Sequence, residues 1–244
     1  MSTVTPLNSA PFPSAAIAQD EPESLQWVPP LTDRRDRMKA LRLLVKRTID
    51  LVGATVGLLL LAPLMFLIGV LIRLDSRGPA LFRQVRLGYR GRPFWMLKFR
   101  TMTVDAEAKL GDLEESNESH GGVLFKLSND PRVTRLGALL RRTSLDELPQ
   151  LINVLRGEMS LVGPRPLQVR DSDRLAALNP RGYQGRLQVP PGVTGPWQIS
   201  GRKDVDYQRM IQLDLDYVGS WSLGSDLWIL LKTFFVVLLG KGAY

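Results

Sequence analysis

An apolar segment, residues 51–72, constrains the fold of this chain more than any other feature, because none of its residues is charged. As a straight helix the segment is long enough to cross a hydrocarbon core of roughly 30 Å. Pro63 lies near its middle, where a proline removes a backbone hydrogen bond and kinks a helix. Two structures therefore remain open, a kinked spanning helix and a re-entrant hairpin that enters and leaves by one leaflet.

Basic residues on both sides of the apolar segment favour the hairpin. Residues 34–47 are strongly basic and place their apolar side chains at helical spacing, as is typical of an interfacial helix. Several further arginines follow within residues 73–92. Because the positive-inside rule pulls both ends toward the cytoplasm, we expect residues 34–75 to form a basic interfacial helix and a re-entrant membrane helix that breaks at Pro63.

Length, charge and composition narrow the classes of function. A chain of 244 residues fits one domain with a tail or an anchor. Its net charge of +8 suits a phosphate-rich partner, whether nucleic acid, anionic lipid or nucleotide. No nucleic-acid-binding motif is present, and much of the positive charge flanks the apolar segment, so we expect no nucleic-acid partner. With no cysteine and a single histidine, His120, any nucleophile or metal ligands must be oxygen groups.

The rest of the chain predicts a tail and a small α+β domain that is mostly helical. Residues 1–33 are polar and rich in proline and serine, which indicates a disordered tail. In residues 76–244 we expect a short β-hairpin from strands at 80–85 and 93–98, and helices at 102–113, 133–142 and 145–156. A last apolar run at 227–239 is interrupted by Lys232 and is expected to lie on the membrane surface.

The adjacent carboxylates Asp146 and Glu147 are the main candidates for chemistry. Ser144 and Glu147 have the spacing of a capping box, so the pair can be explained by helix capping alone. The same arrangement suits phosphate chemistry, since Arg141 and Arg142 would attract a diphosphate while one carboxylate holds a divalent cation and its neighbour attacks phosphorus. Both interpretations remain open at this point.

Three further motifs carry candidate substrate contacts. Arg165 stands between two prolines that stiffen it for phosphate recognition, although an isolated turn of this kind is more often a solvated surface turn. The glycine-punctuated loop 190–202 offers hydroxyl, amide and guanidinium groups that could hold a nucleotide, or forms a packed turn around its tryptophan. Lys98 and Arg100 contact either substrate or membrane. The loop residues concerned are Thr194, Gln198 and Arg202.

Taken together, these motifs resemble a known family. The matching segments are residues 46–50, 98–102, 144–150, 157–166, 191–202 and 221–244. In this order they are similar to the bacterial sugar transferases, the monotopic polyprenyl-phosphate phosphoglycosyltransferases of capsule, exopolysaccharide and O-antigen assembly. The resemblance covers residues 46–244, and with only a polar tail ahead of it the chain resembles the short form of the family. The usual Ser-Pro of the helix break is here Ala62-Pro63.

The resemblance implies an activity and a location. It implies an enzyme at the cytoplasmic face of the bacterial inner membrane that transfers hexose-1-phosphate from a UDP-sugar to undecaprenyl phosphate and releases UMP. Asp146 would be the nucleophile that forms a phosphosugar intermediate, and Glu147 would help bind Mg²⁺. Arg165 and the loop at 192–202 would contact phosphate and uridine.

The resemblance leaves several points open. The segments at 197–202 and 242–244 look more like members that use galactose or glucose. Two alternatives remain: direct attack by the lipid without a covalent intermediate, and a non-catalytic membrane-anchored UDP-sugar-binding or scaffold protein. A homo-oligomer and downstream glycosyltransferases are further partners to be considered.

Overall fold

The computed structural model describes residues 34–118, 127, 129–201 and 206–238. The expected disordered tail, residues 1–33, lies outside the described residues. The chain divides into two compact units, Met1–Leu41 and Arg42–Tyr244. The described part of the first unit is the beginning of helix α1 (Arg34–Asp75), and everything below concerns the second unit. Its fold is α+β and mostly helical, as expected.

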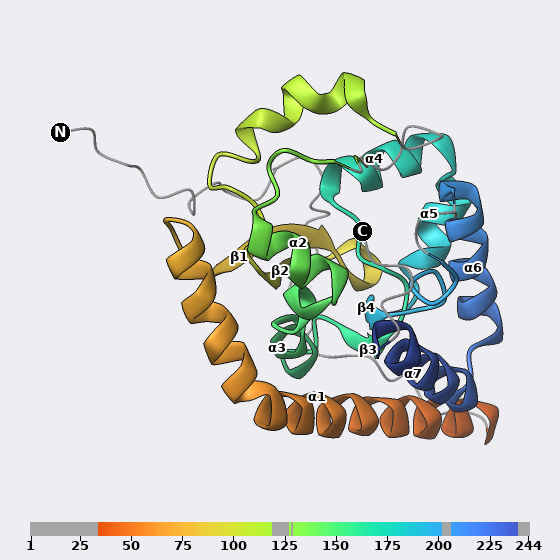
Figure 1. Cartoon of the computed structure of the whole chain (residues 1–244). Coiled ribbons are helices and arrows are strands. Elements are labelled where there is room, and N and C mark those ends of the chain that lie inside the picture. The colour runs from red at the N-terminus through yellow and green to blue at the C-terminus, as the bar shows by residue number, and fades with distance from the viewer. Residues whose placement is uncertain (1–33, 119–126, 128, 202–205, 239–244) are drawn as a thin grey trace. The chain divides into compact units, whose positions relative to one another are not determined.

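Helix α1 is one long helix with Pro63 inside it, and Figure 1 shows that it bends strongly along its length. Two stretches of the helix pack on the domain. Ala54 lies in one core cluster together with Phe94 of the hairpin. Ile72 lies in a second cluster with Phe99, which is also on the hairpin. The bend therefore lets one helix cover the domain with residues from both halves of the apolar segment.

The predicted β-hairpin is confirmed. Strands β1 (Leu81–Leu87) and β2 (Pro93–Phe99) pair antiparallel around a short 3₁₀ turn, η1 (Tyr89–Gly91). Phe94, Met96 and Phe99 of β2 are buried. The hairpin thus supplies the apolar surface on which α1 rests.

The central helices agree with the expectation in part. Helix α2 (Arg135–Arg142) begins where Thr134 accepts a hydrogen bond from the Gly137 amide, at 2.9 Å. The helix expected at 145–156 is instead a 3₁₀ turn, η3 (Leu145–Glu147), followed by α3 (Gln150–Leu155), because Pro149 begins a new helix. The helix expected at 102–113 is replaced by the 3₁₀ helix η2 (Ala108–Ser116).

The C-terminal third is more regular than its prolines and glycines suggested. Strands β3 (Ser160–Val162) and β4 (Gly192–Thr194) form a parallel pair, and helices α4 (Val169–Leu178) and α5 (Pro180–Arg186) connect them. Two helices follow, α6 (Tyr207–Ser220) and α7 (Leu223–Leu238). The second sheet lies next to α7 (Figure 1).

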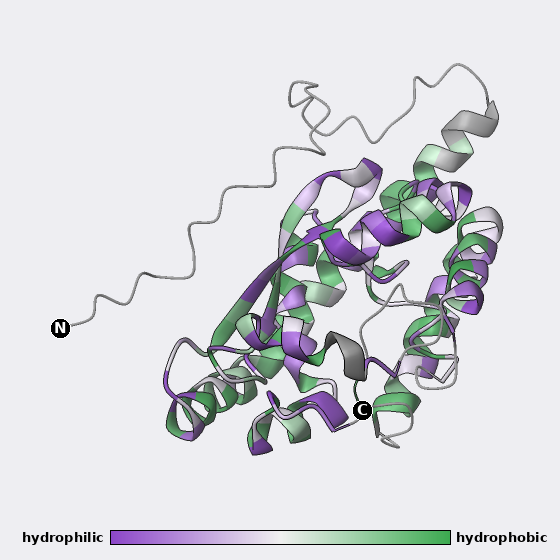
Figure 2. Ribbon diagram, turned by 90° about the horizontal axis from the view of Figure 1, so that it is seen from above, coloured by the Kyte–Doolittle hydropathy of each residue, from purple (hydrophilic) through white to green (hydrophobic). Residues whose placement is uncertain are grey.

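Large apolar side chains remain exposed on α1 and α7. Along most helices in Figure 2 hydrophobic and hydrophilic residues alternate, as expected for helices that pack one face on a core. Within the described residues, α1 is the helix long and apolar enough to cross a membrane, and little of its apolar window is buried. On α7 the exposed side chains are Leu227, Trp228, Leu231, Phe234, Phe235 and Val237. These two helices therefore offer the apolar surface that membrane association requires.

Candidate functional site

A tight turn after α2 places the two carboxylates. Ser144 adopts a left-handed backbone conformation, with φ 56° and ψ 16°, which is costly for a residue with a side chain. Its side chain makes no capping bond to the following turn. The capping-box interpretation is therefore wrong, and η3 instead buries Asp146 and Glu147.

Glu147 is held by two cations. Lys98 Nζ and Arg165 Nη2 each lie 2.9 Å from Glu147 Oε1. Lys98 comes from strand β2 and Arg165 from the loop after β3, so three distant segments meet at one carboxylate oxygen. Burial makes such an arrangement depend on full pairing, since an unpaired buried charge is costly.

Asp146 is less closely paired than its neighbour. Its nearest recorded cation is Lys98, with Nζ 3.9 Å from Asp146 Oδ2. Burial raises the pKa of Asp146 above its usual value, although the positive charges of Lys98, Arg141 and Arg165 act in the opposite direction. Burial likewise lowers the pKa of Lys98. The site thus combines a carboxylate that two cations contact at one oxygen with a carboxylate that has a raised pKa and a more distant cation.

The loop that carries Arg165 is anchored on several sides. The guanidinium of Arg165 lies over the Trp197 ring, 5.7 Å from its centroid. The carbonyl oxygen of Arg165 accepts a hydrogen bond from Arg186 Nη2 at 2.7 Å. On the far side of the loop, Arg86 Nη1 donates to the Pro166 carbonyl at 3.1 Å. Sequence reasoning missed Arg86 and Arg186, because neither belongs to a local motif.

Glycines allow this loop to approach the second sheet. A Cβ at position 163 would lie 2.4 Å from the Pro190 carbonyl oxygen, and one at position 192 would lie 2.1 Å from the Gly163 amide nitrogen. Real side chains cannot come so close to a backbone. Gly163 and Gly192 are therefore required by the packing that supports Arg165.

Of the three other described arginines predicted to contact substrate, only Arg141 is shown close to the acid pair. Arg141 Nε donates to Thr101 at 3.0 Å and is close enough to act on the Asp146 charge. Arg142 is exposed in the last turn of α2. Arg100 is buried and donates to the Ser76 carbonyl at 2.7 Å, so it caps the C-terminal end of α1.

The loop after β4 is only partly described. Thr194 Oγ1 is hydrogen-bonded to Thr233 Oγ1 of α7 at 2.7 Å. Gln198 is 1% exposed, and within the described part of the chain neither amide atom of its side chain has a hydrogen-bond partner. A buried unsatisfied amide is costly, which is consistent with a polar ligand bound there. Arg202 lies outside the described residues.

The carboxylates of the acid pair are the candidate ligands for Mg²⁺. No cluster of three or more carboxylate, imidazole or thiolate groups exists among the described residues. Mg²⁺ is commonly bound through one or two carboxylates together with substrate phosphates. Glu147 would fit that mode if the phosphates of a bound substrate supplied the remaining ligands.

Comparison with known proteins identifies the family. The family model described as "Bacterial sugar transferase" matches residues 41–240. The chain belongs to this family, as the sequence motifs predicted.

Individual relatives are consistent with this assignment. The chain is 46% identical over 202 residues to "Galactosyl transferase CpsE" of Streptococcus agalactiae serotype III, a match covering 82% of the chain and 44% of that protein. It is 43% identical over 209 residues to "Exopolysaccharide production protein ExoY" of Rhizobium meliloti, covering 82% and 88%. It is 40% identical over 227 residues to "UDP-glucose:undecaprenyl-phosphate glucose-1-phosphate transferase" of Escherichia coli K12, covering 91% and 46%. The chain thus spans less than half of some relatives and most of another.

Proposed function

We propose that the protein transfers hexose-1-phosphate from a UDP-sugar to undecaprenyl phosphate, with galactose or glucose as the sugar. The observation that carries the proposal is the buried pair Asp146 and Glu147 surrounded by Lys98, Arg141 and Arg165. Cations around buried carboxylates suit a diphosphate whose charge must be neutralised before a carboxylate can approach it. The names of the relatives cover both sugars and the lipid carrier.

Asp146 is the better nucleophile of the pair. Glu147 shares one oxygen between two cations, whereas the nearest recorded cation of Asp146 lies 3.9 Å away. A carboxylate oxygen of Asp146 attacks the phosphorus that bears the sugar and forms an acyl phosphate on the enzyme, while the bond from that phosphorus to the bridging oxygen breaks and UMP leaves with that oxygen. A phosphate oxygen of undecaprenyl phosphate then attacks the same phosphorus and releases Asp146 as a carboxylate.

The neighbouring residues assist this transfer. Arg165 and Arg141 bind diphosphate oxygens, and Lys98 offsets the negative charge of both carboxylates. Glu147 would hold Mg²⁺ together with the diphosphate, and the ion when bound would neutralise charge on the leaving group. The amide of Gln198 is suited to the uracil ring, which offers both donors and acceptors.

We propose further that α1 enters and leaves the membrane by the cytoplasmic leaflet, with its bend at Pro63. Supporting features are the packing of Ala54 and Ile72 on one domain and the basic residues at both ends of the apolar segment. Since the chain has no native cysteine, single cysteines at Ser14 and Arg83 can be labelled in sealed inner-membrane vesicles. Labelling from the same side supports the hairpin, and labelling from opposite sides rejects it.

The activity is tested with purified protein in nanodiscs, Mg²⁺, a panel of UDP-hexoses and undecaprenyl phosphate, by measuring UMP. We expect UMP from one donor, and none from Asp146→Asn. Trapping of radiolabelled sugar phosphate on the wild-type protein without lipid would distinguish the covalent route from direct attack. Donor binding without UMP release from any sugar would favour the non-catalytic UDP-sugar-binding alternative.

An active enzyme of this kind would catalyse the first membrane step of exopolysaccharide, capsule or O-antigen synthesis at the cytoplasmic face of the inner membrane. The apolar faces of α1 and α7 are suited to that location.

A further inference from the structure

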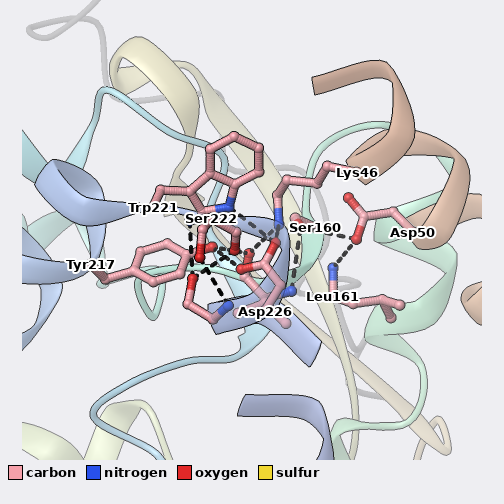
Figure 3. Close-up of polar contacts among 10 residues, drawn as sticks. Lys46, Asp50, Ser160, Leu161, Tyr217, Trp221, Ser222 and Asp226 are labelled. Atoms are coloured by element: carbon pink, nitrogen blue, oxygen red, sulfur yellow. Dashed lines mark hydrogen bonds and ion pairs between the residues drawn. The ribbon is translucent and has the colours of Figure 1, made fainter. Parts of the chain in front are cut away.

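A buried ion pair joins the N-terminal half of α1 to the first turn of α7. Lys46 Nζ lies 2.7 Å from Asp226 Oδ2, and the two side chains are 8% and 9% exposed (Figure 3). Trp221 Nε1 donates to the same carboxylate at 3.0 Å. Lys46 and Asp226 belong to segments that carry the family resemblance, yet the proposed reaction uses neither residue. A buried ion pair by itself is weak evidence for a stabilising role. The segments that Lys46 and Asp226 contact therefore indicate its role better.

The pair holds strand β3. Lys46 Nζ also donates to the Val162 carbonyl at 3.0 Å. Tyr217 Oη donates its single proton to Asp226 Oδ1 at 2.7 Å, and the same hydroxyl oxygen lies 3.2 Å from the Val162 carbonyl oxygen. The carbonyl of Val162 thus accepts a hydrogen bond from Lys46 and lies beside the Tyr217 hydroxyl, and Asp226 fixes both side chains in place.

Asp50, a carboxylate on α1, holds the other end of strand β3. Asp50, one helical turn after Lys46, accepts hydrogen bonds from Ser160 Oγ at 3.0 Å and from the Leu161 amide at 2.9 Å (Figure 3). All three residues of β3 are therefore bonded to α1. The strand cannot shift without breaking buried polar contacts, each of which is costly to leave unsatisfied.

Strand β3 leads directly to the residue that pairs with Glu147. Gly163 and Pro164 alone separate Val162 from Arg165. This link is stiff, because the Gly163 amide donates to the Thr194 carbonyl at 2.9 Å and proline fixes its own backbone angle. Displacement of Val162 would consequently be transmitted to the guanidinium of Arg165.

We propose that Lys46 and Asp226 are positioning residues for the donor diphosphate, acting through β3 on Arg165. The contact between α1 and α7 thereby determines where Arg165 lies relative to Asp146 and Glu147. The inference rests on the proposed function, since Arg165 is taken to bind the donor.

A double-mutant cycle in nanodiscs tests the coupling. UMP release is measured for wild type, Asp226→Asn, Arg165→Ala and the double variant. We expect Asp226→Asn to lower kcat/KM by roughly 10- to 100-fold, mostly through KM for the UDP-sugar, since a misplacement of about 1 Å can cost a factor of about 100. In the Arg165→Ala background the same change should have little further effect, because two residues that act through one contact are not additive.

Ile229→Ala is the matched control. Ile229 is buried on α7 and packs in the same cluster as Val162 and Tyr217, but offers no polar contact to β3. It should lower Tm, yet its effect on kcat/KM should add to that of Arg165→Ala. Should Asp226→Asn fail to fold, Tyr217→Phe removes the hydroxyl that donates to Asp226 and leaves the ion pair, and a smaller effect in the same direction is expected.

The outcomes separate the two proposals. Wild-type UMP release with additive effects of Asp226→Asn and Arg165→Ala overturns the positioning role and leaves the transferase. Equal coupling for Ile229→Ala also overturns it, because general packing would then explain the loss. Absence of UMP from the wild type with every donor overturns the proposed function, and the positioning role with it.

Discussion

Arg165 Nη2 lies 2.9 Å from Glu147 Oε1, so a residue from the loop after β3 meets a residue from the turn after α2. Lys98 reaches the same oxygen at the same distance. Glu147 is consequently the most strongly paired carboxylate of the site. This leaves Asp146, beside it in the chain, as the carboxylate with fewer close partners.

Replacing Arg165 with lysine should impair donor binding more than it impairs folding. Lysine keeps the charge but loses the planar fork that lies over Trp197 and that we propose to bind the donor diphosphate. We expect the KM for the UDP-sugar to rise by about tenfold or more, with a change in Tm of a few degrees at most. Steady-state UMP release measures this. Arg156→Lys, at an exposed arginine, should leave KM unchanged, and an equal rise there would contradict the assignment.

Asp146→Asn should stabilise the protein at neutral pH while abolishing UMP release. The pKa of Asp146 is raised in the folded state, so folded protein holds this proton more tightly than unfolded protein does. The contribution of Asp146 to stability is therefore greatest at low pH and falls as the pH rises through the raised pKa. We expect a gain of about 1 kcal/mol at pH 7.

Thermal unfolding in matched nanodiscs measures that gain at pH 7 and again near pH 4. The difference between wild type and Asp146→Asn should shrink at the lower pH, where both side chains are neutral. Asp112→Asn, at an exposed carboxylate, should change Tm little at either pH. A lower Tm for Asp146→Asn at pH 7 would mean that the attraction of Lys98 outweighs burial.

The rate of UMP release should depend on pH through both Asp146 and Lys98. Attack requires ionised Asp146, so the rate should fall as the pH drops through its raised pKa, above the ordinary value of 3.8. Burial holds the pKa of Lys98 below its ordinary value of 10.5. Lys98 should therefore lose its charge at a lower pH than an exposed lysine, and the rate of UMP release should fall with that loss. In Lys98→Arg the alkaline limb should move upward, and an unchanged limb would show that another group titrates there.

Gly163→Ala should destabilise the loop that carries Arg165. The added Cβ would lie 2.4 Å from the Pro190 carbonyl, which belongs to backbone that cannot yield cheaply. We expect a loss of about 1–3 kcal/mol together with weaker donor binding. Gly219→Ala on α6 is the control, since its Cβ would meet nothing within 4 Å and alanine favours a helix. Equal losses at both positions would refute the close-approach argument.

Local patterns predicted the elements whose signals are contained in a few neighbouring residues. The hairpin at 81–99 follows from short strands around a glycine-containing turn, and α2 follows from apolar residues at helical spacing before two arginines. The pairing of β3 with β4 could not be predicted in this way. Each strand has three residues, and the hydrogen bonds between them join positions separated by two intervening helices.

In the candidate site too, local motifs predicted some features and the tertiary structure was needed for the others. The motif around Asp146 identified the acid pair, yet capping and catalysis had equal support until the backbone of Ser144 and the partners of Glu147 were known. Arg100 belongs to a motif that suggested substrate contact, and its guanidinium instead caps α1. Charge and spacing indicate what a side chain can bind, and the tertiary structure decides which of its partners comes within reach.

By itself, the sequence determined the long apolar segment, the family and the adjacent carboxylates Asp146 and Glu147 as candidates for chemistry, because each depends on residue types at short spacing. Only the tertiary structure decided that Lys98 and Arg165 share one oxygen of Glu147, and that Lys46 pairs with Asp226. These contacts join residues far apart in the chain, and their geometry depends on how α1, the hairpin and the second sheet pack together. Pairing of buried charges is a property of that packing, since burial makes each partner necessary to the other.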